Sequence, residues 1–203
     1  MSTQFIFVRH GESKKNLKKI FGGEGDVLTD LGKQQVEQFI VDLKNRNLTK
    51  PVHVFATPRL QTIQSADIIA KAFNTKTICD ERLRSQDLGA LGGKTAEEQQ
   101  RDCPKEFECF SKWRNREIEA CDLNIADLEP FSKLVDRVID FLKSNDNNEV
   151  NIIVCTRSIM VFAKNYVQGN SLERGGGFLE QYTKNCESVD FLYDKEYRRT
   201  MNA

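Results

Sequence analysis

Residues 4–13 read QFIFVRHGES, and the rest of the fold can be built outward from this stretch. Residues 4–8 are mostly aromatic or β-branched, which is typical of a buried strand. Arg9, His10 and Gly11 follow directly, so a guanidinium and an imidazole stand just past the predicted strand end. Open α/β sheets bind ligands at the carboxyl ends of their strands, and we therefore expect chemistry at this edge.

Strand-like and helix-like stretches alternate along the whole chain. Four further stretches have the composition of strands: residues 52–56 (VHVFA), 75–79, 150–155 (VNIIVC) and 188–193, the last near a sheet edge. Apolar residues recur at helical spacing in four others: residues 36–43, 63–73, 134–142 and 159–167. Strands separated by helices predict an α/β three-layer sandwich with a mostly parallel central sheet. We expect one domain over residues 1–203.

Residues 95–126 depart from this alternation. They are highly charged and carry Phe107, Phe110 and Trp113, which predicts a helical excursion from the domain. Large aromatic side chains are mostly buried in proteins, so we favour packing of these three onto the sheet. A surface for a protein partner is the alternative interpretation.

The charge and residue composition exclude several classes of function. Basic and acidic residues number 30 each, so the chain lacks the broad positive field that nucleic acids or anionic membranes attract. We expect no nucleic-acid binding and no membrane insertion. With two histidines and no metal-ligand spacing, we expect no metal and no other cofactor. Six scattered cysteines without a signal peptide favour free thiols and a cytoplasmic protein, with cytoskeletal or organelle-associated assemblies left open.

Three predicted strand ends carry polar residues. They are Arg9-His10-Gly11, Thr57-Pro58-Arg59 and Thr156-Arg157-Ser158. Cations that converge at strand ends predict a compact anion pocket. An arginine–histidine pair alone is also common on ordinary surfaces, so the functional interpretation needs further pattern.

Further motifs occur in a fixed order along the chain. Arg9-His10-Gly11-Glu12-Ser13, with Asn16 three residues on, resembles the signature of the histidine phosphatase superfamily, which includes phosphoglycerate mutases. Similar segments follow in the family's order: Leu28-Thr29 with Gly32 and Gln35, Thr57-Pro58 with Gln64-Ser65-Ala66, and residues 83–95, 130–142, 152–157 and 185–192. The resemblance covers nearly the whole chain and implies the phosphoglycerate mutase-like fold.

The resemblance also implies roles for individual residues. His10 matches the histidine that attacks phosphorus, for which it must be neutral and present a nitrogen lone pair. Arg9 matches the first arginine that holds the phosphate. Together with Asn16, Gln61 and Arg157, Arg9 forms the expected anion-binding set.

Three positions depart from the family's pattern. Gln61 stands where the family has a second arginine, Ser85 where it has the acid/base glutamate, and Arg157 where it has the second histidine. A neutral amide brings no charge, a serine hydroxyl is a poor general acid, and an arginine does not give up its proton near neutral pH. Arg157 is expected either to hold an anion with Arg9 or to fill the pocket itself and pair with Glu12 or a backbone carbonyl. In either case its charge lowers the pKa of His10 and keeps the imidazole neutral.

Substitutes for the missing groups exist in the sequence. Arg59 precedes Gln61 by two residues, but two helical residues turn a side chain by about 200°, which disfavours a simple exchange. Asp87 and Glu81 are candidates to replace the missing acid. His53 lies in the middle of a predicted strand and is expected to be structural. General acid–base catalysis contributes about 10²–10⁴ in rate, so we expect a catalytically inactive, degenerate member of the family.

Three functions are compatible with this sequence. The first, which we favour, is an inactive phosphatase-like subunit of a larger protein assembly that retains phosphate binding. The second is a weak or specialised phosphomonoesterase that forms a phosphohistidine at His10. The third is a sensor that binds a phosphorylated small molecule and signals to a partner.

Overall fold

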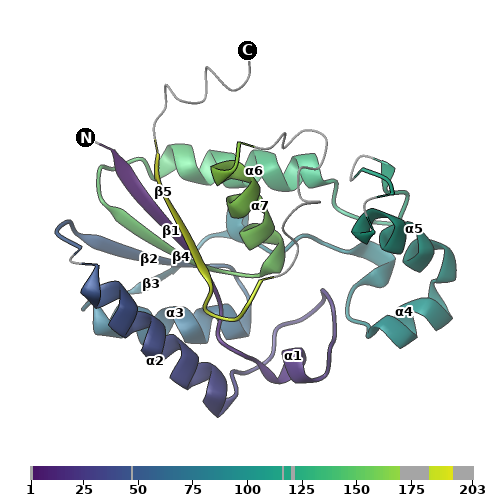
Figure 1. The fold of residues 1–203 in the computed structure, drawn as a ribbon, viewed down its shortest axis with the longest axis horizontal. Coiled ribbons are helices and arrows are strands. Elements are labelled where there is room, and N and C mark those ends of the chain that lie inside the picture. The colour runs from purple at the N-terminus through teal and green to yellow at the C-terminus, as the bar shows by residue number, and fades with distance from the viewer. Residues whose placement is uncertain (1, 47, 116, 120–121, 170–182, 194–203) are drawn as a thin grey trace.

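A five-stranded sheet forms the middle layer of the protein (Figure 1). The computed structural model describes every residue except 1, 47, 116, 120–121, 170–182 and 194–203. Its strands are β1 (Thr3–Arg9), β2 (Val52–Ala56), β3 (Thr77–Cys79), β4 (Val150–Cys155) and β5 (Ser188–Tyr193), in the spatial order β3-β2-β4-β1-β5. The strand expected at 75–79 is therefore shorter than predicted.

The apolar strand β4 lies at the centre of the sheet and is buried at every position. It pairs in parallel with β1 on one side and with β2 on the other, and β3 continues in parallel beyond β2. Only β5, at the edge beside β1, is antiparallel. The prediction of a mostly parallel sheet is confirmed, and the carboxyl ends of β1, β2 and β4 meet at one edge.

Helices cover both faces of the sheet, as a three-layer sandwich requires (Figure 1). Helices α2 (Asp30–Asn45) and α3 (Leu60–Ala72) lie on one face, and α6 (Phe131–Ser144) and α7 (Arg157–Val167) lie on the other. Successive side chains of a strand point to opposite faces of the sheet, so β1 contributes to the hydrophobic core on each face. Phe5 and Phe7 pack with α6 and α7, whereas Ile6 and Val8 pack with α2 and α3.

The predicted excursion contains two helices at one end of the molecule (Figure 1). Helix α4 (Ala96–Asp102) begins at a capping box of Thr95 and Glu98, and α5 (Pro104–Arg114) begins with a proline. Further short elements among the described residues are α1 (Lys14–Leu17) and the 3-10 turns η1 (Glu81–Leu83) and η2 (Gly89–Leu91).

The aromatic residues of the excursion are not packed onto the sheet, contrary to our expectation. Phe107, Phe110 and Trp113 are half-buried, and none belongs to the two clusters that cover the sheet. Helix α5 packs against α4 and η2 instead. The reason is that α4 and α5 lie beyond the end of the sheet, so the aromatic side chains of α5 face other helices and loops (Figure 1).

Other expectations can be compared with the described part of the chain. All five cysteines described there are free thiols, and no group of three potential metal ligands occurs there. No helix within it has the length and apolar character needed to cross a membrane.

Two glycines bring the loop after β1 into contact with the start of α2. A Cβ atom on Gly32 would lie 2.0 Å from the carbonyl oxygen of Glu12, and one on Gly11 would lie 2.3 Å from that of Gly32. Thr29, the N-cap of α2, also donates its hydroxyl to the Glu12 carboxylate at 2.9 Å. Helix α2 therefore fixes the backbone on which His10 stands.

The Gly32→Ala variant tests this contact. Alanine in a helix normally stabilises by up to about 1 kcal/mol relative to glycine. Here the methyl group meets a backbone carbonyl that cannot move aside, so we expect a net loss of at least about 2 kcal/mol. Chemical denaturation measures it, with the exposed neighbour Lys33→Ala as control. A Gly32→Ala protein as stable as the parent would contradict this description of the loop.

Candidate active site

His10 stands just past the end of β1 and is buried, with 4% of its surface exposed. Its peptide is held at both ends: the N–H donates to Cys155 of β4 at 3.1 Å, and the carbonyl accepts from Asn185 Nδ2 at 2.9 Å. The next amide, that of Gly11, donates to the Ser65 hydroxyl of α3 at 3.1 Å. Three parts of the fold thus fix the position of one imidazole.

The protonation state of His10 follows from its surroundings. Burial, opposed by the hydrogen bond to Gly11 but reinforced by the charges of Arg9 and Lys15, lowers the pKa of His10 from 6.5 to about 4. Nδ1 lies 2.7 Å from the Gly11 carbonyl oxygen, which can only accept. The proton of the neutral ring therefore sits on Nδ1, and Nε2 keeps its lone pair. The pKa of His10 is lowered, as expected, but the causes are burial and the charges of Arg9 and Lys15, and not the charge of Arg157.

A cavity of about 280 Å³ opens beside His10. All six candidate residues from the sequence line it: Arg9, His10, Asn16, Gln61, Ser85 and Arg157. They come from the end of β1, from α1, from the starts of α3 and α7, and from the loop after η1. The structure therefore brings together residues that lie up to 148 positions apart in the chain.

The cavity is strongly cationic. Its described lining includes five basic side chains and no acidic one; the basic residues are Arg9, Lys15, Lys19, Arg59 and Arg157. Burial and the nearby Arg59 guanidinium lower the pKa of the Lys15 ammonium. Like charges gathered around one space favour an anion there, because it relieves their mutual repulsion.

Arg59 corrects one inference from the sequence. We expected the helical turn to direct Arg59 away from the position that Gln61 occupies, yet both residues line the cavity. The reason is that α3 begins only at Leu60, and Arg59 is its N-cap with an extended backbone (φ −139°, ψ 142°). The rotation of a helix does not apply to a residue outside it. The Arg59 guanidinium can therefore contact an anion in the cavity and take the place of the arginine that is missing at position 61.

Two amides face the same cavity. The Oδ1 atom of Asn16 accepts from the Ser13 amide at 3.0 Å, and the Oε1 atom of Gln61 accepts from the Asp26 amide at 3.1 Å. With their oxygens engaged, both side chains retain an NH₂ group that can donate to an anion. Through its bond to Asp26, Gln61 also holds the segment between β1 and α2 against α3. This segment carries Lys15 and Lys19.

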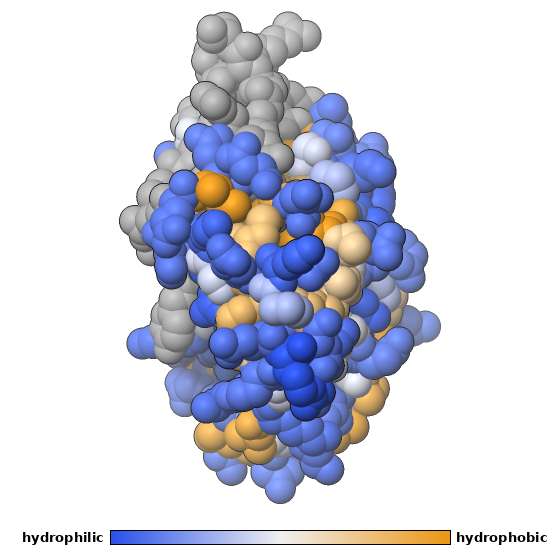
Figure 2. Space-filling model, turned by 90° about the vertical axis from the view of Figure 1, so that its right-hand side faces the viewer, coloured by the Kyte–Doolittle hydropathy of each residue, from blue (hydrophilic) through white to orange (hydrophobic). Residues whose placement is uncertain are grey.

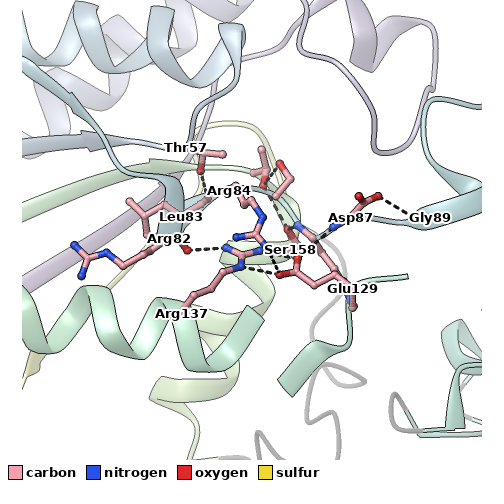
Figure 3. A network of polar contacts seen from close by, with 12 residues as sticks. Thr57, Arg82, Leu83, Arg84, Asp87, Gly89, Glu129, Arg137 and Ser158 are labelled. Carbon is pink, nitrogen blue, oxygen red and sulfur yellow. Dashed lines mark hydrogen bonds and ion pairs between the residues drawn. The ribbon is translucent and has the colours of Figure 1, made fainter. Parts of the chain in front are cut away.

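Ser85 lies on a segment that a buried carboxylate holds in place (Figure 3). Glu129 accepts from Arg84 at 2.7 Å and from Arg137 at 2.9 Å, and the Asp87 amide also points to it. Burial would raise the pKa of Glu129, but its bonds with Arg137 and Arg84 outweigh that and lower it. Glu129 therefore stays ionised and structural, and the hydroxyl that reaches the cavity is that of Ser85, 3.0 Å from Thr156 Oγ1.

Arg157 is the first residue of α7 and is exposed. Its guanidinium carbon lies 5.9 Å from the centre of the Phe21 ring, a cation–π distance. The Glu12 carboxylate, which we considered as a partner of Arg157, accepts a hydrogen bond from the Thr29 hydroxyl at 2.9 Å. Arg157 thus lines the cavity as a cation placed against an aromatic face.

The other proposed substitutes do not reach the cavity. Neither Glu81 nor Asp87 is among its lining residues, and Asp87 accepts from the Gly89 amide at 3.0 Å. His53 in β2 pairs with Glu149, at the opposite end of the sheet, which agrees with the structural role expected for it.

Sequence reasoning missed Lys15, Lys19, Phe21 and Asn185. Lysines within a glycine-rich loop directly after Arg9-His10-Gly11 are a signal that a count of local charge would have found. Phe21 carries no comparable signal, because its place beside Arg157 depends on how residues 20–25 fold back.

The comparison with known families decides the identity of this fold. Residues 5–195 match the model of the histidine phosphatase superfamily (branch 1). The chain belongs to this superfamily. The resemblance inferred from the motifs is therefore correct at the level of the family.

Individual histidine phosphatase relatives agree. The probable phosphoglycerate mutase GpmB of Escherichia coli is 32% identical over 143 residues, which make up 70% of this chain and 62% of that protein. The chain spans between 40% and 62% of the length of the curated relatives it matches first.

Solved structures share the fold. Bacillus stearothermophilus YhfR matches with a TM-score of 0.78 and 20% identity, covering 96% of this chain and 93% of that one. A mycobacterial glucosyl-3-phosphoglycerate phosphatase solved with VO3 matches with a TM-score of 0.72 and 16% identity, covering 92% and 90%. At these identities the likeness establishes the fold alone.

The pKa of His10 can be measured by NMR. In a His53→Gln variant, His10 is the only histidine, so its ring protons titrate without overlap. We expect a midpoint near pH 4. Because the folded pKa lies below the unfolded one, stability is full above about pH 6.5 and falls as the pH drops toward the folded value. A midpoint at or above 6.5 would show that the ring is neither buried nor influenced by cations.

The contribution of Arg59 can be measured with inorganic phosphate. A hydrogen bond to a charged group is worth about 1.5–3 kcal/mol, so Arg59→Ala should weaken phosphate binding roughly 10- to 100-fold in calorimetry. Arg101→Ala is the control, because Arg101 is exposed and pairs with Asp102 away from the cavity. Equal affinities in the two variants would remove Arg59 from the anion site.

Proposed function

We propose that this protein is a phosphoric monoester hydrolase that works slowly, through a phosphohistidine at His10. The observation that carries the proposal is the state of that residue. His10 is neutral, its Nδ1 is held by the Gly11 carbonyl, and five cations share its cavity. A buried imidazole with a lone pair on Nε2, placed where anions collect, is an arrangement suited to attack on phosphorus.

The proposed reaction has two steps. In the first, the Nε2 lone pair forms a bond to phosphorus while the ester P–O bond breaks, and its electron pair stays on the leaving oxygen. In the second, water attacks phosphorus, the P–N bond breaks and its electron pair returns to Nε2. One water proton goes to the released alcohol through solvent and the other stays on phosphate. Arg9, Arg59 and the two amides would stabilise the phosphoryl oxygens in both steps.

The same site explains why the reaction should be slow. The described lining of the cavity offers Ser85 and Arg157, and neither delivers a proton to a leaving alkoxide near neutral pH. General acid catalysis is worth about 10²–10⁴. From the sequence we expected no activity, because the missing general acid was accompanied by a missing arginine at the position of Gln61. The Arg59 guanidinium, which lines the cavity, can take the place of that arginine. Only the general acid is then missing, which favours weak activity over none.

An inactive phosphate-binding protein is the second candidate. Ser85 and Arg157 favour it, because retained cations bind ground states as readily as transition states. In that case the chain would serve as a subunit of a larger assembly or as a sensor of phosphorylated small molecules. The cytoplasmic location expected from the sequence fits either function and stays a prediction.

Trapping the intermediate separates the two candidates. The protein is incubated with p-nitrophenyl phosphate, quenched, and assayed for acid-labile, alkali-stable phosphate. The proposal predicts labelling that His10→Ala abolishes. His10→Ala should still bind inorganic phosphate, because the cations remain, and this shows that the variant is folded. No labelling of the parent protein, with phosphate binding intact, would favour the inactive candidate.

Restoring a carboxylic acid tests the role assigned to Ser85. Ser85→Glu should raise kcat for glycerol phosphate, whose alkoxide needs a proton, by about 10²-fold or more. Ser85→Gln is the matched control, because it has the same size without an acidic proton. If both variants behave alike, the missing acid does not limit the rate.

A further inference from the structure

A second cavity of about 150 Å³ lies next to the one that contains His10. Its apolar lining comes from four parts of the fold: from Leu88, from Phe110 and Trp113 of α5, from Phe131 of α6 and from Val161 of α7. The polar side chains of Gln86, Arg114 and Ser158 also line it. We call it the aromatic annex. The Phe110 and Trp113 rings lie 5.2 Å apart, within the range of contacting aromatic pairs.

The two cavities share a wall. Phe21, Gly22, Ser85, Thr156 and Arg157 line both of them. A molecule whose phosphate lies near His10 would therefore pass this wall to reach the annex. The wall is where the ester oxygen of such a molecule would lie, and Arg157 and Ser85 are part of it.

Helix α5 contributes Phe110 and Trp113 to the annex, at the end of the molecule where α4 and α5 lie (Figure 1). Figure 2 faces this end and shows hydrophobic residues between hydrophilic ones near the middle of the view. A cavity of about 150 Å³ has room for a small group and not for a segment of a partner protein.

The size of the annex suggests which group. An apolar cavity of about 150 Å³ in a protein accommodates one benzene molecule. Aromatic walls also favour an aromatic occupant, since ring pairs gain attraction beyond the area they bury. The annex thus suits a single ring attached to the phosphate.

The chemistry of the wall points in the same direction. Without a general acid, the leaving oxygen must depart as an anion. A phenol has a pKa near 10, as in tyrosine, whereas water lies near 15.7 and simple alcohols are comparable to it. A phenolate is therefore a far better unprotonated leaving group than an alkoxide. The Arg157 guanidinium can stabilise its negative charge without giving up a proton.

We propose that the preferred substrates are aryl phosphate monoesters, with the ring in the aromatic annex and Arg157 beside the leaving oxygen. This inference rests on the proposed hydrolase function and names its substrate class. The His10 Nε2–P bond forms as the P–O(aryl) bond breaks. The phenolate takes up a proton from solvent after it leaves.

Substrate comparison is the first arm of the test. Phenyl phosphate and cyclohexyl phosphate have rings of similar size, but only phenyl has a good leaving oxygen, and glycerol phosphate has neither property. We expect kcat/KM to fall in the order phenyl, cyclohexyl, glycerol. Cyclohexyl phosphate should inhibit phenyl phosphate hydrolysis at least about tenfold more strongly than glycerol phosphate does.

Variants of α5 form the second arm. Trp113→Ala and Phe110→Ala should each raise KM for phenyl phosphate about tenfold, while the affinity for inorganic phosphate stays unchanged. Phe107→Ala is the matched control, because Phe107 lies on the same helix outside the annex. Unchanged phosphate affinity also shows that each variant is folded.

The outcomes distinguish the two proposals. If His10 is never phosphorylated by any ester, the hydrolase function fails. If His10 is phosphorylated, but inhibition by cyclohexyl phosphate matches that by glycerol phosphate, the annex does not bind the ring and this inference alone is overturned. The substrate arm needs no variant, so a misfolded Trp113→Ala protein would not leave the question open.

Discussion

The hydrogen bond between His10 Nδ1 and the Gly11 carbonyl, inside a buried site, is the interaction on which the rest of the active site depends. It fixes the ring's orientation, and burial with two nearby cations keeps the ring neutral. The bond is possible because the loop after β1 packs closely against the start of α2. This close contact requires glycine at positions 11 and 32, where a Cβ atom would collide with the backbone. The order of the strands, the packing of α2 and the glycine contacts therefore together fix the position of the His10 ring and the direction of its Nε2 lone pair.

Around that neutral ring the fold gathers five basic side chains in one cavity. The buried carboxylate of Glu129 is paired with Arg84 and Arg137 and does not line the cavity. The five basic residues that line it carry like charges, and an anion bound among them would lower their mutual repulsion. Ligand binding is thus coupled to stability: an anion that binds only the folded state stabilises it in proportion to its concentration. In the proposed hydrolase function, Ser85 and Arg157 would decide which esters that anion site can cleave.

Most of the fold could be predicted from the sequence because its signals are local and repeated. Strands such as residues 150–155 are apolar throughout, and helices such as α6 carry a regular apolar stripe. All six candidate site residues also proved to share one cavity, since motifs at the ends of parallel strands must meet. The position of Arg59 was not predictable with helical geometry, because it depends on where α3 begins. The aromatic annex was not predictable either, because it forms between α5, α6 and α7, far apart in sequence.

The tautomer of His10 is the most direct test of this account. A two-bond proton–nitrogen NMR spectrum of the His53→Gln protein at neutral pH reports which ring nitrogen carries the proton. The account predicts a proton on Nδ1 and an unprotonated Nε2, which shifts when inorganic vanadate is added. A proton on Nε2, or a doubly protonated ring, would contradict it, because no lone pair would then face the anion cavity.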